Sequence, residues 1–267
     1  MNNNKVVYNE RDFKAYSRST IYIQKQTNRL LAFSLLWLGV AILFISLFTF
    51  SILSIESLYS VYSNLTYSMT SNAMRVIFTI ILLVGINFGV SYYIGKYALA
   101  EKPTTFFLVF LFLIFVLANS FLLPMFFASQ ILLGKSSYIM IAIAGAGGLM
   151  TLIGILGYFQ VINFGKILPL IIIGFLIEIV LAIASYFIFS SFLNTLYSLV
   201  GISVTLGTIG YQFWLIRNQS CQILAFYTDE NEIKRIFLRV AIWNALSLYI
   251  SFIRLFLFII RLLSSRT

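Results

Sequence analysis

Seven long apolar runs dominate the sequence, and each is long enough to cross a lipid bilayer as a helix. They cover residues 30–53, 76–97, 104–127, 138–159, 167–189, 196–216 and 236–263. About 20 apolar residues are needed, because a helix rises about 1.5 Å per residue and the hydrocarbon core is roughly 30 Å thick. Only 10% of the residues are charged, against about 25% in soluble proteins. We therefore expect an all-α polytopic membrane protein with seven transmembrane helices.

The distribution of Lys and Arg predicts how these helices are oriented, because short loops rich in them stay in the cytoplasm. With the amino terminus inside, thirteen basic residues fall inside and four outside. The inside set is Lys5, Arg11, Lys14, Arg18, Lys25, Arg29, Lys96, Lys102, Lys166, Arg217, Lys234, Arg235 and Arg239, and the outside set is Arg75, Lys135, Arg261 and Arg266. We expect a multi-pass protein of the cell membrane with a cytoplasmic amino terminus and an external carboxyl terminus. Residues 54–74 would form an external loop.

The net charge of +10 is concentrated at the amino end, where six of the eighteen basic residues precede residue 30. This pattern favours a cytoplasmic flank that contacts anionic membrane lipids over a nucleic-acid partner. We divide the chain into a basic cytoplasmic tail, residues 1–29, and a transmembrane domain, residues 30–267. The tail could be a disordered lipid contact or a short amphipathic helix, and its spacing leaves both open.

Several kinds of chemistry are disfavoured by what the sequence lacks. It has no histidine, and Cys221 is its single cysteine, so a zinc site, a Ser-His dyad and an internal disulfide are not expected. Glu178 is the one carboxylate inside an apolar run, whereas an aspartyl protease needs two. We expect no catalytic residues, no metal site and no cofactor.

The last run carries polar side chains at helical spacing. Asn244, Ser247, Ser251 and Arg254 follow at steps of three, four and three, so they share one face of a helix. An arginine facing lipid costs at least about 2.5 kcal/mol, so this face is expected to look into the bundle or a pore, with six helices around this central seventh. For Asn244 and Ser247 the simpler interpretation is preferred, namely hydrogen bonds that bridge helices.

Arg254 needs an anion or water if it lies inside the bundle. Glu178, near the middle of the fifth run, is the available carboxylate. An ion pair between these two residues is therefore our hypothesis.

Small residues recur at three-residue spacing in the fourth run, at Gly148, Thr151, Gly154 and Gly157. Gly201, Gly207 and Gly210 in the sixth run suggest the same use. Small residues let helix backbones approach closely in a membrane, so we expect packing faces here rather than ligand sites.

Two segments resemble the Bax inhibitor-1 (transmembrane Bax-inhibitor-motif) family. Residues 245–256 read Ala-Leu-Ser-Leu-Tyr-Ile-Ser-Phe-Ile-Arg-Leu-Phe, where the family usually has Ala-Leu-Ser-Leu-Tyr-Leu-Asp-Phe-Ile-Asn-Leu-Phe. Residues 207–217 are similar to a family segment ending Tyr-Asp-Thr-Gln-Lys-Ile-Lys. Gln212 and Ser251 stand where the family has aspartates, so the chain resembles a divergent bacterial-type member.

The resemblance implies a bundle of six helices around a central seventh and a pathway that leaks cations such as calcium. In the family, the two aspartates are thought to share a proton and act as a pH-sensitive latch. Here Gln212 and Ser251 can hydrogen-bond but cannot titrate. Arg254 adds a positive charge one turn away, which would repel cations unless Glu178 neutralises it.

Two functions remain open. The first is a weak or pH-insensitive leak for cations such as calcium. The second is a non-conducting regulator that binds other membrane proteins through its glycine-rich faces and basic tail.

Overall fold

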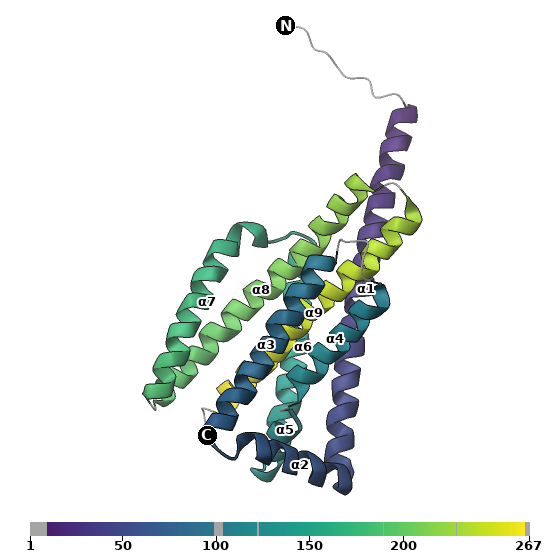
Figure 1. Cartoon of the computed structure of the whole chain (residues 1–267). Helices are drawn as coiled ribbons and strands as arrows, with labels where there is room; N and C mark the ends of the chain where they lie inside the picture. The colour runs from purple at the N-terminus through teal and green to yellow at the C-terminus, as the bar shows by residue number, and fades with distance from the viewer. Residues whose placement is uncertain (1–9, 99–103, 122, 189, 228, 265–267) are drawn as a thin grey trace.

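The computed structural model describes residues 10–98, 104–121, 123–188, 190–227 and 229–264, and these form helices joined by short connections (Figure 1). The helices are α1 (Glu10–Ser54), α2 (Glu56–Thr70), α3 (Ala73–Tyr97), α4 (Thr105–Ser120), α5 (Leu123–Leu132), α6 (Ser136–Tyr158), α7 (Phe164–Phe187), α8 (Ser191–Phe226) and α9 (Glu230–Ser264).

The seven predicted membrane spans are confirmed. Seven helical segments of the described chain are long and apolar enough to cross a membrane: six are provided by α1, α3, α6, α7, α8 and α9, and one by α4 and α5 together. The ends of α3, α6 and α7 lie within a few residues of the predicted runs. The first span begins earlier than predicted, at Ile21, the α4–α5 span ends later, at Leu132, and α8 and α9 extend beyond their runs towards the connection that joins them.

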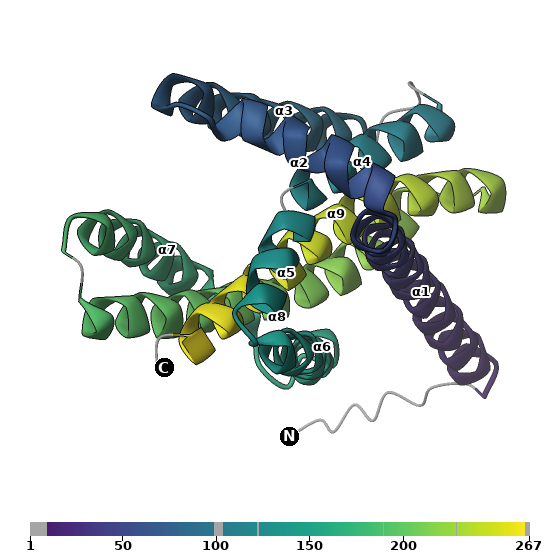
Figure 2. The same ribbon diagram turned by 90° about the horizontal axis from the view of Figure 1, so that it is seen from below.

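The central position of the last helix is also confirmed. α9 packs against α1, α3, α4, α6 and α8, and it runs through the middle of the bundle when the molecule is viewed along its length (Figure 2). Its buried residues include Phe237, Leu248 and Tyr249. α7 lies at the periphery, where it packs against α8.

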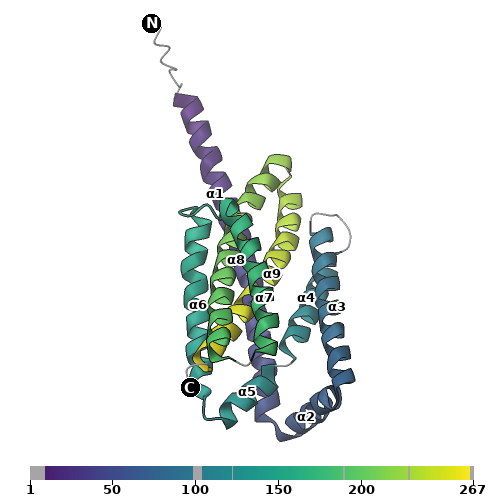
Figure 3. The same ribbon diagram turned by 90° about the vertical axis from the view of Figure 1, so that its left-hand side faces the viewer.

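The amino-terminal flank is continuous with the first span. α1 begins at Glu10 and shows no break at residue 29, so the described part of the predicted tail is helical, and it projects beyond the bundle in Figure 3. Residues 1–9 of that tail lie outside the described residues.

Residues 54–74, predicted as a loop, are mostly the helix α2, so the description as a loop is wrong. This helix lies across the end of the bundle (Figures 1 and 3), where it packs against α1 and α3. The run of Ser, Thr, Asn and Tyr that suggested a loop gives a helix of low mean hydropathy, whose Tyr62 and Thr66 side chains are buried.

The single run predicted over residues 104–127 is instead broken between α4 and α5. Pro124, in the first turn of α5, has no N–H for an i→i−4 bond. The Tyr62 hydroxyl lies in the opened ladder, donating to the Phe121 carbonyl at 2.6 Å and accepting from the Met125 N–H at 3.3 Å. An unbroken helix would join those two backbone groups directly. Burial raises the pKa of Tyr62, so the hydroxyl keeps the proton that it donates.

Glycine brings α6 and α8 into backbone contact. A Cβ on Gly157 would collide with the backbone carbonyl of Gly210, and one on Gly154 would lie 2.8 Å from the Phe213 ring. Gly148 is different, because nothing lies within 4 Å of the position that its Cβ would take. The predicted packing face is therefore real at Gly154 and Gly157 but does not include Gly148.

Candidate intramembrane polar site

The two positions that the family resemblance singled out meet between α8 and α9. The Gln212 side-chain amide donates from Nε2 to the Ser251 Oγ at 3.0 Å and to the Ser247 carbonyl at 3.1 Å. The Ser251 hydroxyl lies 3.2 Å from Gln212 Oε1 and 3.0 Å from the Ser247 carbonyl, and can donate to either. Ser251 is buried and Gln212 half-buried. We call these three residues the gate cluster, after the latch that the family resemblance implies at these positions.

No member of the gate cluster titrates near neutral pH, since its polar groups are an amide, a hydroxyl and a backbone carbonyl. Both Nε2 hydrogens of Gln212 are engaged by α9. The cluster therefore joins the two helices by neutral hydrogen bonds alone.

One turn further along α9, Arg254 forms an ion pair with Glu178 of α7. Arg254 Nη2 lies 2.7 Å from Oε1 and 2.8 Å from Oε2 of the carboxylate. The Glu178 side chain is 9% exposed and that of Arg254 is 29% exposed. The two formal charges cancel, which lowers the cost of placing either one within the membrane.

Aromatic rings and a glycine hold Arg254 in place. The guanidinium carbon lies 5.5 Å from the centre of the Phe175 ring and 5.9 Å from that of Phe258, within the range of a cation–π contact. Phe258 can take this position because Gly201 of α8 has no side chain, and a Cβ there would overlap its ring.

Polar contacts continue along α8 and α9 past the ion pair. Arg261 donates to the Asn194 side-chain oxygen at 2.8 Å, and its guanidinium carbon lies 4.5 Å from the centre of the Tyr197 ring. The gate cluster, the ion pair and this contact thus form a polar series that leads towards the carboxyl-terminal end of α9.

Asn244 and Ser247 do not form the side-chain bridges predicted for them. Asn244 is buried at 5% exposure, but its Nδ2 has no hydrogen-bond partner among the described residues. Ser247 joins the helices through its backbone carbonyl, which accepts from Gln212. The stripe predicted on α9 is present, but at these two positions the interpretation was wrong in its details.

Sequence reasoning missed a second set of polar links between helices. The hydroxyls of Ser120 and Tyr249 are 3.0 Å apart between α4 and α9, and Ser220 donates to Thr27 at 3.1 Å between α8 and α1. Their signal is weak, because a single Ser, Thr or Tyr in an apolar run can bond to its own helix equally well.

A metal site has little support in the described part of the chain. No group of three or more His, Cys, Asp or Glu side chains lies together there, and the Glu178 carboxylate is already neutralised by Arg254.

A sequence comparison identifies the family. The family model described as "Inhibitor of apoptosis-promoting Bax1" matches residues 25–267, which include the last six spans, all but the first turn of the first span, and every residue of the polar series. No curated protein matches the chain. The match extends over most of the sequence, and the chain therefore belongs to the Bax inhibitor-1 family.

Proposed function

We propose that this membrane protein provides a weak leak for cations such as calcium, whose gate does not respond to pH. The observation that supports this proposal is the direct hydrogen bond between Gln212 and Ser251, at the positions of the family's aspartates. In this proposal the amide and the hydroxyl hold α8 and α9 together as the carboxyl pair does in the family, but no proton has to leave for the gate to open.

The ion pair supports a cation pathway despite the arginine. A free guanidinium along the route would repel a divalent cation. Because both oxygens of Glu178 lie within 2.8 Å of Arg254, the pair presents no net charge to a passing ion. We further propose that the protein is in the cell membrane with its amino terminus in the cytoplasm, and that it is not an enzyme.

A second candidate is a non-conducting regulator that binds other membrane proteins. It is favoured by the hydrogen bonding of Gln212, because both hydrogens of its Nε2 are already donated to α9. Water or an ion that entered the gate cluster would have to replace these bonds.

The test is ion flux in liposomes that hold the purified protein, measured for calcium and for a monovalent cation between about pH 5.5 and 7.5. The proposal expects flux above that of empty liposomes, without a pH-dependent step. The Gln212→Asp, Ser251→Asp variant should then acquire a step of roughly tenfold, because two facing carboxyls raise the pKa of one of them towards this range.

The matched control is Gln212→Asn with Ser251→Asn, which has the same shape as the aspartate variant but no titrating group. Its flux should remain flat with pH. A pH step in the native protein would contradict a non-titrating gate. Absence of flux in the native protein together with flux in the aspartate variant would favour the regulator.

A further inference from the structure

A long apolar groove lies between α1 and α6, on the side of α9 away from the ion pair. Both helices pack against α8 and α9 but do not form a packing interface with each other, and Figure 2 shows them apart. Two cavities, of about 290 Å³ and about 500 Å³, follow one another along this space and share Ile42 and Phe252 as lining residues. We call them together the α1–α6 groove.

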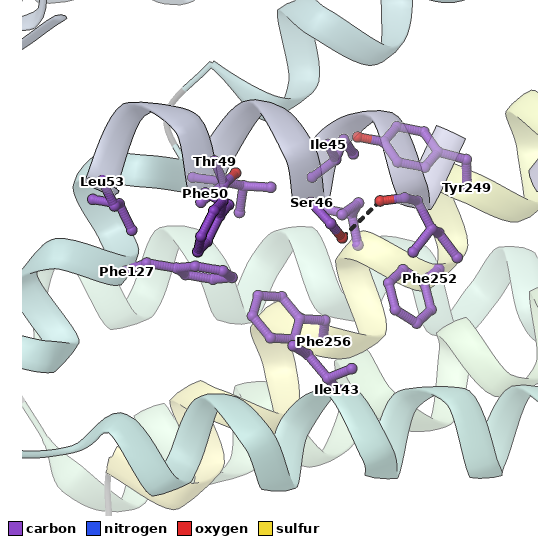
Figure 4. Close-up of a pocket in the computed structure, with 13 residues that line it drawn as sticks. Ile45, Ser46, Thr49, Phe50, Leu53, Phe127, Ile143, Tyr249, Phe252 and Phe256 are labelled. Atoms are coloured by element: carbon purple, nitrogen blue, oxygen red, sulfur yellow. Dashed lines mark hydrogen bonds between the residues drawn. The ribbon is translucent and has the colours of Figure 1, made fainter. Parts of the chain in front are cut away.

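The groove has the length of a membrane. Along α1 its lining runs from Asn28 to Leu53, a rise of about 38 Å that exceeds the roughly 30 Å hydrocarbon core. Figure 4 shows the half nearer α2, with Phe50 and Phe127 at one end and Phe252 and Phe256 of α9 along the wall. The other half lies between Leu35 of α1 and Gly147 of α6.

Its lining suits hydrocarbon. The hydroxyls of Ser46 and Thr151 donate to the carbonyls of Ile42 and Gly147 in their own helices, both at 2.8 Å. These side chains therefore offer no free donor to the groove. The Tyr249 hydroxyl is paired with Ser120, so the Thr49 hydroxyl is the lining hydroxyl without a partner among the described residues. The rest of the lining between the two ends is aliphatic and aromatic apart from Gly147 and Gly154.

The end of the groove that lies nearer the amino terminus of α1 is polar and basic. There the Tyr158 hydroxyl donates to Asn28 Oδ1 at 2.6 Å, and Arg217 donates to the Tyr158 carbonyl at 3.1 Å. Lys25 is exposed three residues before Asn28, so it continues the groove face of α1. Arg217 uses one of its five donors in this contact.

Negative charge is absent from the lining of the groove. The sequence has no Asp or Glu in residues 13–55, 102–177 or 179–228, which include every lining segment of α1, α5, α6 and α8. Five acidic residues are described at this end of the molecule, and none of them lines the groove. Asp229, Glu230 and Glu232 belong to the α8–α9 connection and the start of α9, and Glu10 and Asp12 lie in the first turn of α1, about 20 Å before Lys25 along the helix. An apolar groove that ends at basic groups is complementary to a lipid with an acyl chain and an anionic headgroup.

We propose that the α1–α6 groove binds an acyl chain of an anionic phospholipid from the leaflet on the amino-terminal side, with Lys25 and Arg217 facing its phosphate. The bound lipid covers the surface that α1 and α6 leave between them. This site does not depend on whether the protein conducts ions.

The experiment uses the full chain in vesicles that contain phosphatidylglycerol or phosphatidylcholine, each with the same photoactivatable acyl chain. Labelled peptides are then quantified by mass spectrometry. We expect the label to concentrate on the groove-lining peptides of α1 and α6, with about fivefold more from phosphatidylglycerol for each basic residue that faces the headgroup. Equal labelling by the two lipids, or labels spread evenly over α3 and α7, would overturn the proposal.

Two pairs of variants sharpen this test. Gly147→Leu places a side chain in the groove, whereas Gly148→Leu adds the same side chain to the adjacent position, outside the groove lining; nothing lies within 4 Å of either Cβ site. Gly147→Leu should lower groove labelling at least about fivefold, and Gly148→Leu should leave it unchanged. If both variants label as the native chain does, the groove is not the site.

The second pair concerns the headgroup and leaves the groove intact, so it remains informative if Gly147→Leu fails to fold. Lys25→Gln should remove about fivefold of the preference for phosphatidylglycerol. Lys166→Gln, at an exposed lysine at the start of α7 on the same side of the membrane, should keep that preference. An unchanged preference in Lys25→Gln would overturn the assignment. So would groove labelling below that of the other exposed faces, which is the result expected if a second copy of the chain or another helix covered the groove.

Discussion

Arg254 and Glu178 lie 76 residues apart in the sequence, yet one guanidinium nitrogen contacts both oxygens of the carboxylate, at 2.7 and 2.8 Å. The contact joins α9, at the centre of the bundle, to α7, at its edge. α8 is the helix against which α7 otherwise packs. The ion pair thus links the peripheral helix α7 directly to the central helix α9.

Loss of one partner should destabilise the protein more than loss of both. Glu178→Leu or Arg254→Leu leaves an unpaired charge, and we expect each to lower the free energy of unfolding by about 2–3 kcal/mol, below the roughly 3–5 kcal/mol of a fully buried pair because Arg254 is partly exposed. The double variant should lose less than either single one. Unfolding in detergent measures these free energies. The control combines Lys166→Leu with Arg254→Leu: Lys166 lies about 18 Å from Glu178 along α7, so the two losses should add. Additive losses for the Glu178 and Arg254 pair would refute a direct interaction.

The break between α4 and α5 should depend on the hydroxyl of Tyr62. Tyr62→Phe leaves the Phe121 carbonyl and the Met125 N–H without the partner that they share, at a cost of about 1–3 kcal/mol for a buried polar group left unsatisfied. Amide hydrogen exchange at Met125 should become faster. The control is Tyr59→Phe, one turn earlier on the exposed side of α2, and an equal change in both variants would count against the role of this hydroxyl.

Alanine should have opposite effects at two glycines of α6. At Gly157 the new Cβ would push α6 away from the Gly210 backbone, and we expect a loss of about 1–3 kcal/mol, as for other overpacked sites. At Gly148 the Cβ meets open space, so the gain in helix propensity, up to about 1 kcal/mol, should remain. Thermal unfolding of the two variants and the native protein in the same detergent measures both changes in stability. A stable Gly157→Ala variant would show that α6 and α8 can separate at no cost.

The gate cluster should contribute no pH dependence to the stability of the native chain, because Gln212 and Ser251 do not titrate. In the Gln212→Asp, Ser251→Asp variant, repulsion raises the folded-state pKa of one carboxyl above its unfolded value. Stability is then greatest below the unfolded pKa of about 4 and is lost as the pH rises through the raised pKa, by about 1.4 kcal/mol for each unit of the shift. Unfolding between about pH 4 and 8 tests this sign, and a variant that becomes more stable as the pH rises would contradict a facing pair.

Much of the architecture could be predicted from the sequence, because lipid imposes a simple rule on it. A chain cannot leave backbone groups unpaired in hydrocarbon, so seven apolar runs had to be helices, and the polar stripe on the last one placed it at the centre. Glu178 and Arg254 were predicted to pair because each is expensive alone and the apolar runs offered few partners.

The missed features depend on three-dimensional position. A loop is predicted in place of α2 because this segment is rich in Ser, Thr, Asn and Tyr and lies between two apolar runs. The position of α2 against the bundle, where Tyr62 is buried, cannot be predicted from that composition. The same holds for the opening between α4 and α5, which needs a hydroxyl from a segment 59 residues earlier. Gly148 and Gly157 have the same spacing pattern, but only Gly157 faces α8.

The 76-residue separation of Glu178 and Arg254 also has a consequence for biosynthesis. At about 5–20 residues per second, the ribosome adds the arginine roughly 4–15 s after the glutamate. During that interval α7 carries a carboxylate with no cation opposite it. The nascent helix must therefore wait at the translocon, or enter the bilayer with Glu178 unpaired, until α9 arrives. Arg254 would then complete membrane integration of a helix made well before it.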